Sequence, residues 1–182
     1  DEEPLSEAVL SPYALQKAEN ERYADLYARL FGIQSLGLRY FNVYGPRQDP
    51  NSPYSGVIAK FIERYAVKEK ITIFGDGEQS RDFIYVTEVA KANWLALQST
   101  NVGALNIATG TAETLRNLLS YIEEVGGYPA QCDFTSARTG DIEKSFAKID
   151  KAAKELGFCA TINLEHGIKL LLSHQAGEIT HA

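Results

Sequence analysis

A phenol and an ammonium group occur four residues apart near the start of the chain, as Tyr13 and Lys17. Residues at positions i and i+4 share one face of a helix, so a helix here would place the two side chains next to each other. The pKa of a tyrosine is ordinarily near ~10, and a neighbouring cation lowers it by favouring the phenolate. Tyr13 is therefore a candidate proton-transfer residue.

The sequence predicts a helix that contains both Tyr13 and Lys17. Apolar residues recur at helical spacing from Tyr13 to Phe31, Ser11 is a candidate N-cap, Pro12 would be the first helical residue, and Gly32 follows the end. The motif by itself is weak, because a chain with ten tyrosines has roughly an even chance of containing Tyr-x-x-x-Lys. Its meaning depends on the rest of the chain.

The remaining sequence predicts alternating strands and helices, the pattern of an α/β protein with a mostly parallel sheet. Strands are expected at 33–44, 71–74, 83–86, 104–108 and 132–135. Helices are expected at 56–68, 87–98 with Thr87 as the cap, 114–125, 150–156 and 164–174.

Composition narrows the classes of partner. The 182 residues carry a formal net charge of -6, which argues against nucleic acid or an anionic membrane as the main partner. With no apolar run of membrane-spanning length and no signal peptide, we expect a cytoplasmic protein. Cys132 and Cys159 lack metal-ligand spacing, so buried free thiols and no metal site are expected. The chain has no methionine and begins Asp1-Glu2-Glu3-Pro4, which we interpret as part of a longer polypeptide.

Four motifs follow one another along the chain: Tyr13-x-x-x-Lys17, the run 38–47 (LRYFNVYGPR), Gly75-Asp76-Gly77 with 80–86 (SRDFIYV), and the run 138–141 (RTGD). In this order and spacing, the chain resembles the extended short-chain dehydrogenase/reductase superfamily. It is most similar to the NAD-dependent nucleotide-sugar epimerases and dehydratases, and among them to the UDP-glucose and UDP-GlcNAc 4-epimerases. The resemblance runs from about Ser11 to about Leu172.

The resemblance implies the second half of a Rossmann-like doubly wound parallel sheet plus a smaller mixed α/β substrate-binding lobe. Residues of about 11–50 would be the remnant of the Rossmann domain, and about 51–182 mostly the nucleotide-sugar-binding lobe. The family's glycine-rich phosphate loop is absent from this sequence, so we expect that an N-terminal NAD-binding half is missing and that these 182 residues alone are inactive. Relatives are commonly homodimers joined through helices that include the tyrosine helix.

The resemblance also assigns roles at the cofactor. Tyr13 matches the catalytic tyrosine. Lys17 matches the lysine that holds the nicotinamide ribose and lowers the pKa of that tyrosine. Phe41 matches a residue beside the nicotinamide of NAD.

Further positions match the family's substrate ligands. Two of them, Asn42 and Arg81, match ligands of the diphosphate. The lining of the nucleotide-base pocket is matched by Gly56, Val57, Thr72 and Phe74. Contacts to phosphate and ribose are matched by Arg138 and Asp141. A position near the sugar is matched by Ser145. Arginine suits a diphosphate because its guanidinium is a planar fork of donors. A small serine leaves room for an acetamido group.

The implied reaction is epimerisation at C4 of a UDP-hexose or UDP-N-acetylhexosamine through a transient 4-keto sugar. Two alternatives stay open. A nucleotide-sugar 4,6-dehydratase would use an additional acidic pair from the segment expected to be missing. A module that binds nucleotide sugars without catalysis belongs to another class. The residues decide neither the base nor the sugar.

Overall fold

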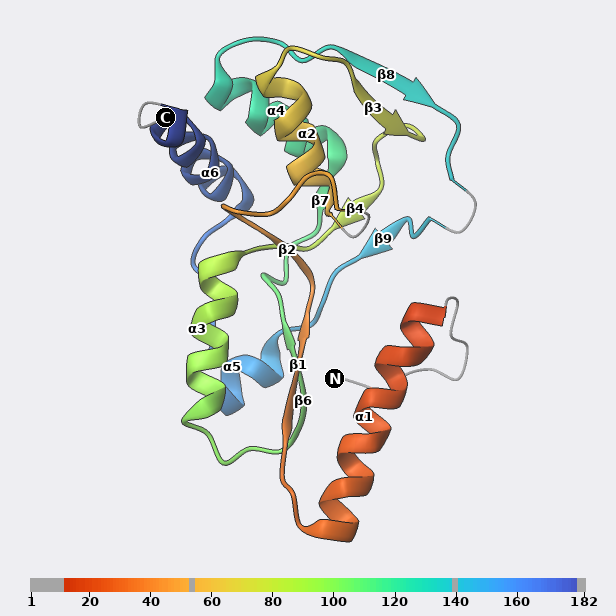
Figure 1. Ribbon diagram of the computed structural model, residues 1–182, viewed down its shortest axis with the longest axis vertical. Helices are drawn as coiled ribbons and strands as arrows, with labels where there is room; N and C mark the ends of the chain where they lie inside the picture. Colours follow the sequence, from red (N-terminus) through yellow and green to blue (C-terminus); the bar gives the residue numbers. More distant parts are fainter. Residues whose placement is uncertain (1–11, 53–54, 139–140, 180–182) are drawn as a thin grey trace.

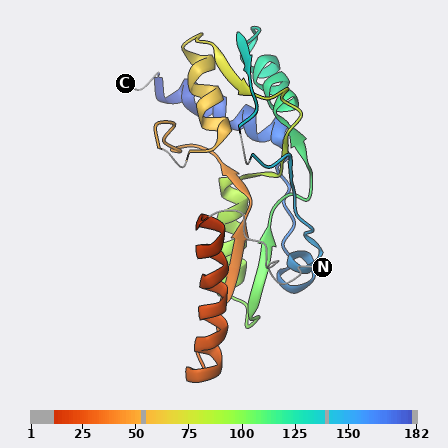
Figure 2. The same ribbon diagram turned by 90° about the vertical axis from the view of Figure 1, so that its right-hand side faces the viewer.

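The computed structural model describes residues 12–52, 55–138 and 141–179 as an elongated molecule with two lobes (Figures 1 and 2). Each lobe combines parallel strands with helices, so the α/β class expected from the sequence is confirmed. None of the helices in these ranges is long and apolar enough to cross a membrane.

One lobe is built on the parallel pair β1 (Leu36–Tyr40) and β6 (Gly103–Ile107), in which Leu38 is opposite Leu105. Helix α1 (Pro12–Phe31) lies on one side of this pair. Helices α3 (Val86–Leu97) and α5 (Asp150–Leu156) lie on the other side (Figure 1). The core between the strands, α3 and α5 contains Ile84, Ala92, Leu105, Ile107, Ala152 and Phe158.

The second lobe holds the parallel pair β3 (Ile71–Phe74) and β8 (Cys132–Thr135) together with three helices. The helices are α2 (Val57–Ala66), α4 (Leu115–Gly126) and α6 (Leu164–Ile179). Their apolar faces meet in a larger core whose fully buried members include Ile58, Ile62, Ile71, Ile73, Leu118, Ile122 and Ile168.

Short strands connect the lobes. Strand β2 (Asn42–Tyr44) pairs in parallel with β5 (Phe83–Tyr85). A three-stranded sheet in the order β7, β4, β9 lies beside them, with bounds Glu113–Thr114, Ser80–Arg81 and Lys144–Ser145.

The single strand expected at 33–44 is wrong in two respects, because it begins at Leu36 and breaks at Phe41. Up to Tyr40 the chain pairs with β6, and the Phe41 N–H still donates to the Ile107 carbonyl at 3.2 Å. From Asn42 onward it pairs with β5, beginning with the Asn42 N–H and the Asp82 carbonyl at 3.0 Å. The break is therefore a change of partner, which a strand-forming sequence does not reveal.

Two local expectations also need correction. Thr87 does not cap α3, because β5 runs directly into the helix and the extended Tyr85 is the N-cap residue without a side-chain cap. Cys159 is exposed and Cys132 is half-buried, although both are free thiols. By contrast, α4 begins as expected, with the Thr114 hydroxyl accepting from the Asn117 N–H at 3.0 Å.

The division expected near residue 50 stays a prediction. The structure adds that the chain returns to the β1–β6 lobe, since Ile84, Leu105 and Phe158 belong to that core. Each lobe is thus assembled from separate stretches of sequence.

The ends of α2 and α4 are held together by a pair of stacked tyrosines. The rings of Tyr65 and Tyr128 lie 4.1 Å apart and are tilted by only 5°. The Tyr65 hydroxyl donates to the Tyr128 carbonyl at 2.8 Å, and the Tyr128 hydroxyl donates to the Tyr65 carbonyl. A Cβ atom on Gly126 would lie 2.3 Å from the Tyr65 ring, so the stack requires glycine there.

We predict that Gly126→Ala destabilises the full-length protein by about 1–3 kcal/mol, because the locked Tyr65 ring has no room to shift. Helix propensity alone would give the opposite sign. Gly37→Ala is the matched control, since its Cβ would meet the nearest atom at 3.5 Å. Denaturant unfolding of both variants measures the difference, and a Gly126→Ala protein as stable as the control would contradict the prediction.

Candidate active site

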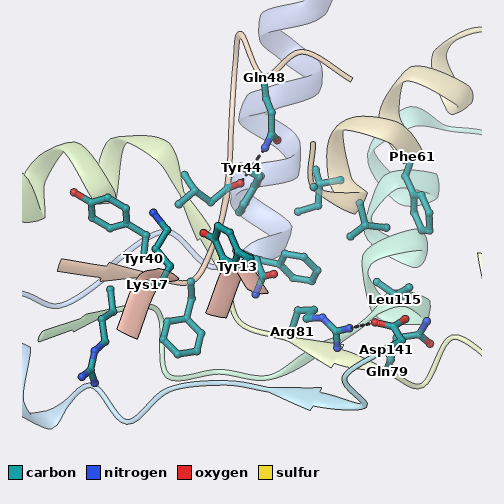
Figure 3. Close-up of a pocket in the computed structure, with 18 of the residues that line it drawn as sticks. Tyr13, Lys17, Tyr40, Tyr44, Gln48, Phe61, Gln79, Arg81, Leu115 and Asp141 are labelled. Carbon is teal, nitrogen blue, oxygen red and sulfur yellow. Dashed lines mark hydrogen bonds and ion pairs between the residues drawn. The ribbon is translucent and has the colours of Figure 1, made fainter. Parts of the chain in front are cut away.

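A cavity of about 1190 Å³ opens between the two lobes (Figure 3). Its walls come from α1, from β1 and β2, from the start of α2, and from β3 and β4. Eleven of the twelve site residues expected from the sequence line it: Tyr13, Lys17, Phe41, Asn42, Gly56, Val57, Thr72, Phe74, Arg81, Arg138 and Asp141. Residues more than 120 positions apart in the chain therefore face one space.

Tyr13 and Lys17 lie on the first turns of α1, as the spacing predicts. The Lys17 Nζ is 5.4 Å from the centre of the Tyr13 ring. Tyr13 is 64% exposed within the described part of the chain, so its hydroxyl is open to a ligand in the cavity. Figure 3 places Tyr13 between Lys17 on one side and Arg81 with Asp141 on the other.

Phe41 and Asn42 reach the cavity because the strand changes partner there. The Asn42 side-chain amide donates to the Asp82 carbonyl at 2.9 Å, which fixes the orientation of the amide. An asparagine amide carries two N–H donors, so this bond leaves the second for an anionic ligand.

Two guanidinium groups also line the cavity, those of Arg81 and Arg138. Arg81 Nη2 donates to Asp141 Oδ1 at 2.9 Å and Arg81 Nη1 donates to the Ser80 carbonyl at 2.8 Å. The guanidinium carbon of Arg138 lies 3.7 Å from the centre of the Phe74 ring, a stacked cation–π contact. The lining of the cavity thus combines cationic donors with an aromatic face.

The N-terminus of α2 also borders the cavity. Gly56 is the N-cap residue, with extended φ and ψ of -66° and 162°, and no side chain caps the helix. The first N–H groups of a helix attract anions and carbonyl oxygens. Thr72 and Phe74 on β3 complete this part of the wall.

Ser145 is the expected site residue that does not line the cavity. It lies in β9 opposite Arg81, and its carbonyl accepts from the Asp82 N–H at 2.8 Å. Its assigned effect on the sugar stays a prediction.

The sequence pattern of the NAD dependent epimerase/dehydratase family matches residues 1–108. The chain belongs to this family. Among curated relatives, a protein of Methanocaldococcus jannaschii provisionally named a UDP-glucose 4-epimerase is 42% identical over 164 residues, which are 90% of this chain and 53% of that protein. The family resemblance drawn from the sequence is thereby confirmed.

Solved structures of epimerases have the same fold. The UDP-glucose 4-epimerase of Thermotoga maritima, solved with UDP-glucose, is 38% identical with a TM-score of 0.90, covering 94% of this chain and 55% of that one. The UDP-N-acetylglucosamine 4-epimerase of Methanobrevibacter ruminantium, in complex with UDP-N-acetylmuramic acid, is 39% identical with a TM-score of 0.89, covering 97% and 58%. The chain thus spans about half the length of the relatives it matches.

The family depends on NAD. The UDP-glucose 4-epimerase of Thermus thermophilus was solved with NAD. It is 35% identical with a TM-score of 0.86, covering 97% of this chain and 59% of that one. In this epimerase-family chain, the expected cofactor residues Tyr13, Lys17 and Phe41 all face the cavity. A phenol, an ammonium group and an aromatic ring suit a ribose diol and a nicotinamide ring. Within the described residues, no group of three or more His, Cys, Asp or Glu side chains could hold a metal ion.

Several lining residues were not found from the sequence. Gln48 and Gln79 donate to the carbonyls of Val43 and Phe74 at 3.3 and 2.6 Å. Glu21 on α1 and Arg39 on β1 form an ion pair. The family motifs do not mark either glutamine, but Glu21 could have been found, because it lies four residues after Lys17 on the same helix face.

Tyr40 and Tyr44 also line the cavity, but their hydroxyls have surroundings different from that of Tyr13. The Tyr40 hydroxyl donates to Asn93 Oδ1 at 2.9 Å. Burial, with a smaller effect of Tyr85, raises the pKa of the Tyr44 phenol, which therefore keeps its proton. Of the tyrosines in the described walls of the cavity, Tyr13 has the lysine ammonium beside it.

Asp82 stabilises the backbone next to the site through buried hydrogen bonds. Its side chain is fully buried, and one carboxylate oxygen accepts from the Thr109 N–H at 2.8 Å and the Thr109 hydroxyl at 2.7 Å. The other oxygen accepts from the Gly110 N–H at 2.8 Å. Since the Asp82 carbonyl also orients Asn42, this residue fixes the junction between the lobes.

We predict that Asp82→Asn lowers the free energy of unfolding by about 1–3 kcal/mol, because an amide N–H would face a buried backbone donor. Asp133→Asn is the control: it removes one exposed partner of Lys70 and is expected to change stability by less than about 0.5 kcal/mol. Denaturant unfolding of the full-length protein measures both. Equal small losses would contradict the buried role of Asp82.

Proposed function

We propose that the full-length protein catalyses NAD-dependent epimerisation at C4 of a UDP-hexose or UDP-N-acetylhexosamine, through a transient 4-keto sugar. The observation that carries the proposal is the shared cavity of the Tyr13–Lys17 pair with Arg81, Arg138 and Asp141. The names of the relatives support 4-epimerase over 4,6-dehydratase.

Tyr13, Lys17 and Phe41 would hold the nicotinamide end of the cofactor. The chemistry that bound NAD would supply is reversible hydride transfer at sugar C4. Tyr13 as phenolate takes the proton from the C4 hydroxyl and later gives it back. The Lys17 ammonium stabilises the negative charge on the phenolate oxygen.

The nucleotide end of the substrate would stay fixed while the 4-keto sugar rotates about the diphosphate. Arg81 and Asn42 are proposed to hold the diphosphate, with Arg138 and Asp141 at phosphate and ribose. Asp141 already accepts a charge-assisted hydrogen bond from Arg81, so a ribose hydroxyl would share this carboxylate. Gly56, Val57, Thr72 and Phe74 are proposed to surround the base, and Ser145 to leave room near the sugar.

Three further properties remain proposals. A homodimer is proposed from the family resemblance, and the exposed aromatic side chains of Tyr23 and Tyr27 on α1 are compatible with it. A cytoplasmic location and the inactivity of these 182 residues on their own also stay predictions. The alternatives of a dehydratase and of a module that only binds nucleotide sugars are distinguished by analysing the product formed from UDP-galactose.

We predict that Tyr13→Phe lowers kcat of the full-length enzyme by about 10²- to 10⁴-fold, the usual contribution of a positioned general base. Tyr23→Phe is the matched control, since Tyr23 lies on the same helix and is 61% exposed. Conversion of UDP-galactose to UDP-glucose is the assay. A Tyr13→Phe enzyme within threefold of the control would rule out the catalytic assignment.

Arg81→Met is predicted to weaken binding of UDP by about 10- to 100-fold, because a charge-assisted hydrogen bond to the diphosphate is lost. Binding of uridine should weaken much less, since it has no phosphate. Arg64→Met is the control, because Arg64 pairs with Glu69 on the surface. Calorimetry measures the four affinities, and equal losses for UDP and uridine would place Arg81 elsewhere than at the diphosphate.

A further inference from the structure

Three side chains with complementary chemistry follow one another along the cavity face of α1. Tyr13, Lys17 and Glu21 are spaced by four residues, so they lie on one side of the helix, and all three line the cavity. The Lys17 ammonium therefore has two neighbours on its own helix. One is the phenol a turn before it, and the other is the carboxylate a turn after it.

Glu21 is instead engaged by a residue of another element. Arg39 on β1 donates to it twice, from Nε to Oε1 and from Nη2 to Oε2, both at 2.7 Å. The two side chains are 25% and 32% exposed. A bidentate pair uses both carboxylate oxygens and holds them in one orientation.

The Lys17 side chain lies toward Tyr13 and not toward Glu21. Its Nζ lies over the Tyr13 ring, and no ion pair joins Lys17 to Glu21 among the residues that the structure describes. A lysine and a glutamate at this spacing on a helix attract one another. Arg39 removes that attraction because its guanidinium neutralises the carboxylate and occupies its oxygens.

We propose that Arg39 is a positioning residue for the reaction: by holding both oxygens of Glu21, it keeps the Lys17 ammonium beside Tyr13. The inference rests on the proposed function for the roles of Tyr13 and Lys17. It differs from a simple tie between α1 and β1, in which Glu21 and Arg39 would contribute equally. In the proposal Glu21 is harmful once Arg39 is removed.

Four full-length proteins separate these possibilities: wild type, Arg39→Met, Glu21→Gln and the double variant. We expect Arg39→Met to lower kcat about tenfold, Glu21→Gln to lower it less than about threefold, and the double variant to recover to within about threefold of wild type. Loss in Glu21→Gln equal to that in Arg39→Met, or a double variant no better than Arg39→Met, overturns the proposal.

A crystal structure of the Arg39→Met protein provides a readout that needs no activity. The Lys17 Nζ is expected within about 4 Å of the Glu21 carboxylate, the distance of an ion pair. Lys17 remaining over Tyr13 overturns the proposal. If the wild-type protein does not epimerise any UDP-hexose, the proposed function fails, while this distance still tests the role of Arg39.

Arg39→Lys is the second variant should Arg39→Met not fold. A lysine is a point charge and cannot bind both oxygens in a planar fork. We expect a smaller loss of kcat that Glu21→Gln again reverses. A loss that Glu21→Gln does not reverse overturns the proposal.

Discussion

The site depends on the change of strand partner at Phe41. Backbone donors and acceptors inside a protein must be paired, and here the pairing passes from the Ile107 carbonyl to the Asp82 carbonyl within two residues. Those two hydrogen bonds fix the backbone of Phe41 and Asn42 from both lobes. The cavity opens at this crossing, so its walls come from each lobe and its shape follows from how the strands are shared.

The charges in the cavity differ from those of the chain as a whole. The chain carries -6, whereas the described lining holds four cationic side chains and two carboxylates: Lys17, Arg39, Arg81 and Arg138 against Glu21 and Asp141. Each carboxylate is paired with an arginine. A concentration of positive charge in a cleft attracts anions regardless of the overall charge, so an acidic protein can hold a diphosphate.

The sequence predicted the elements better than their partners. Helix α1 begins at the expected Pro12, and β3 and β8 have the expected bounds, because local periodicity and turn residues determine these features. The break at Phe41 could not be predicted, since it depends on strands more than 40 residues away. The same holds for the Arg39–Glu21 pair, although the helical spacing of Glu21 from Lys17 was visible.

The candidate site was predicted through motif order rather than through geometry. Composition alone could not have shown that Tyr13 and Arg138 line one cavity. It also could not have shown that Ser145, which pairs with Arg81 across β4 and β9, does not line it. A residue's place in a strand pair decides which way its side chain points, and that pairing lies outside local sequence. Asp82 is a further case, because its three hydrogen bonds reach the loop after β6.

The Arg39–Glu21 ion pair contributes little energy but has a defined direction. A partly exposed ion pair contributes only about 0–1 kcal/mol to stability, too little to hold a helix of 20 residues. Its stronger effect is directional: it determines which of two neighbours the Lys17 ammonium faces. Arg39 therefore acts on where charge lies beside Tyr13 more than on whether the fold persists.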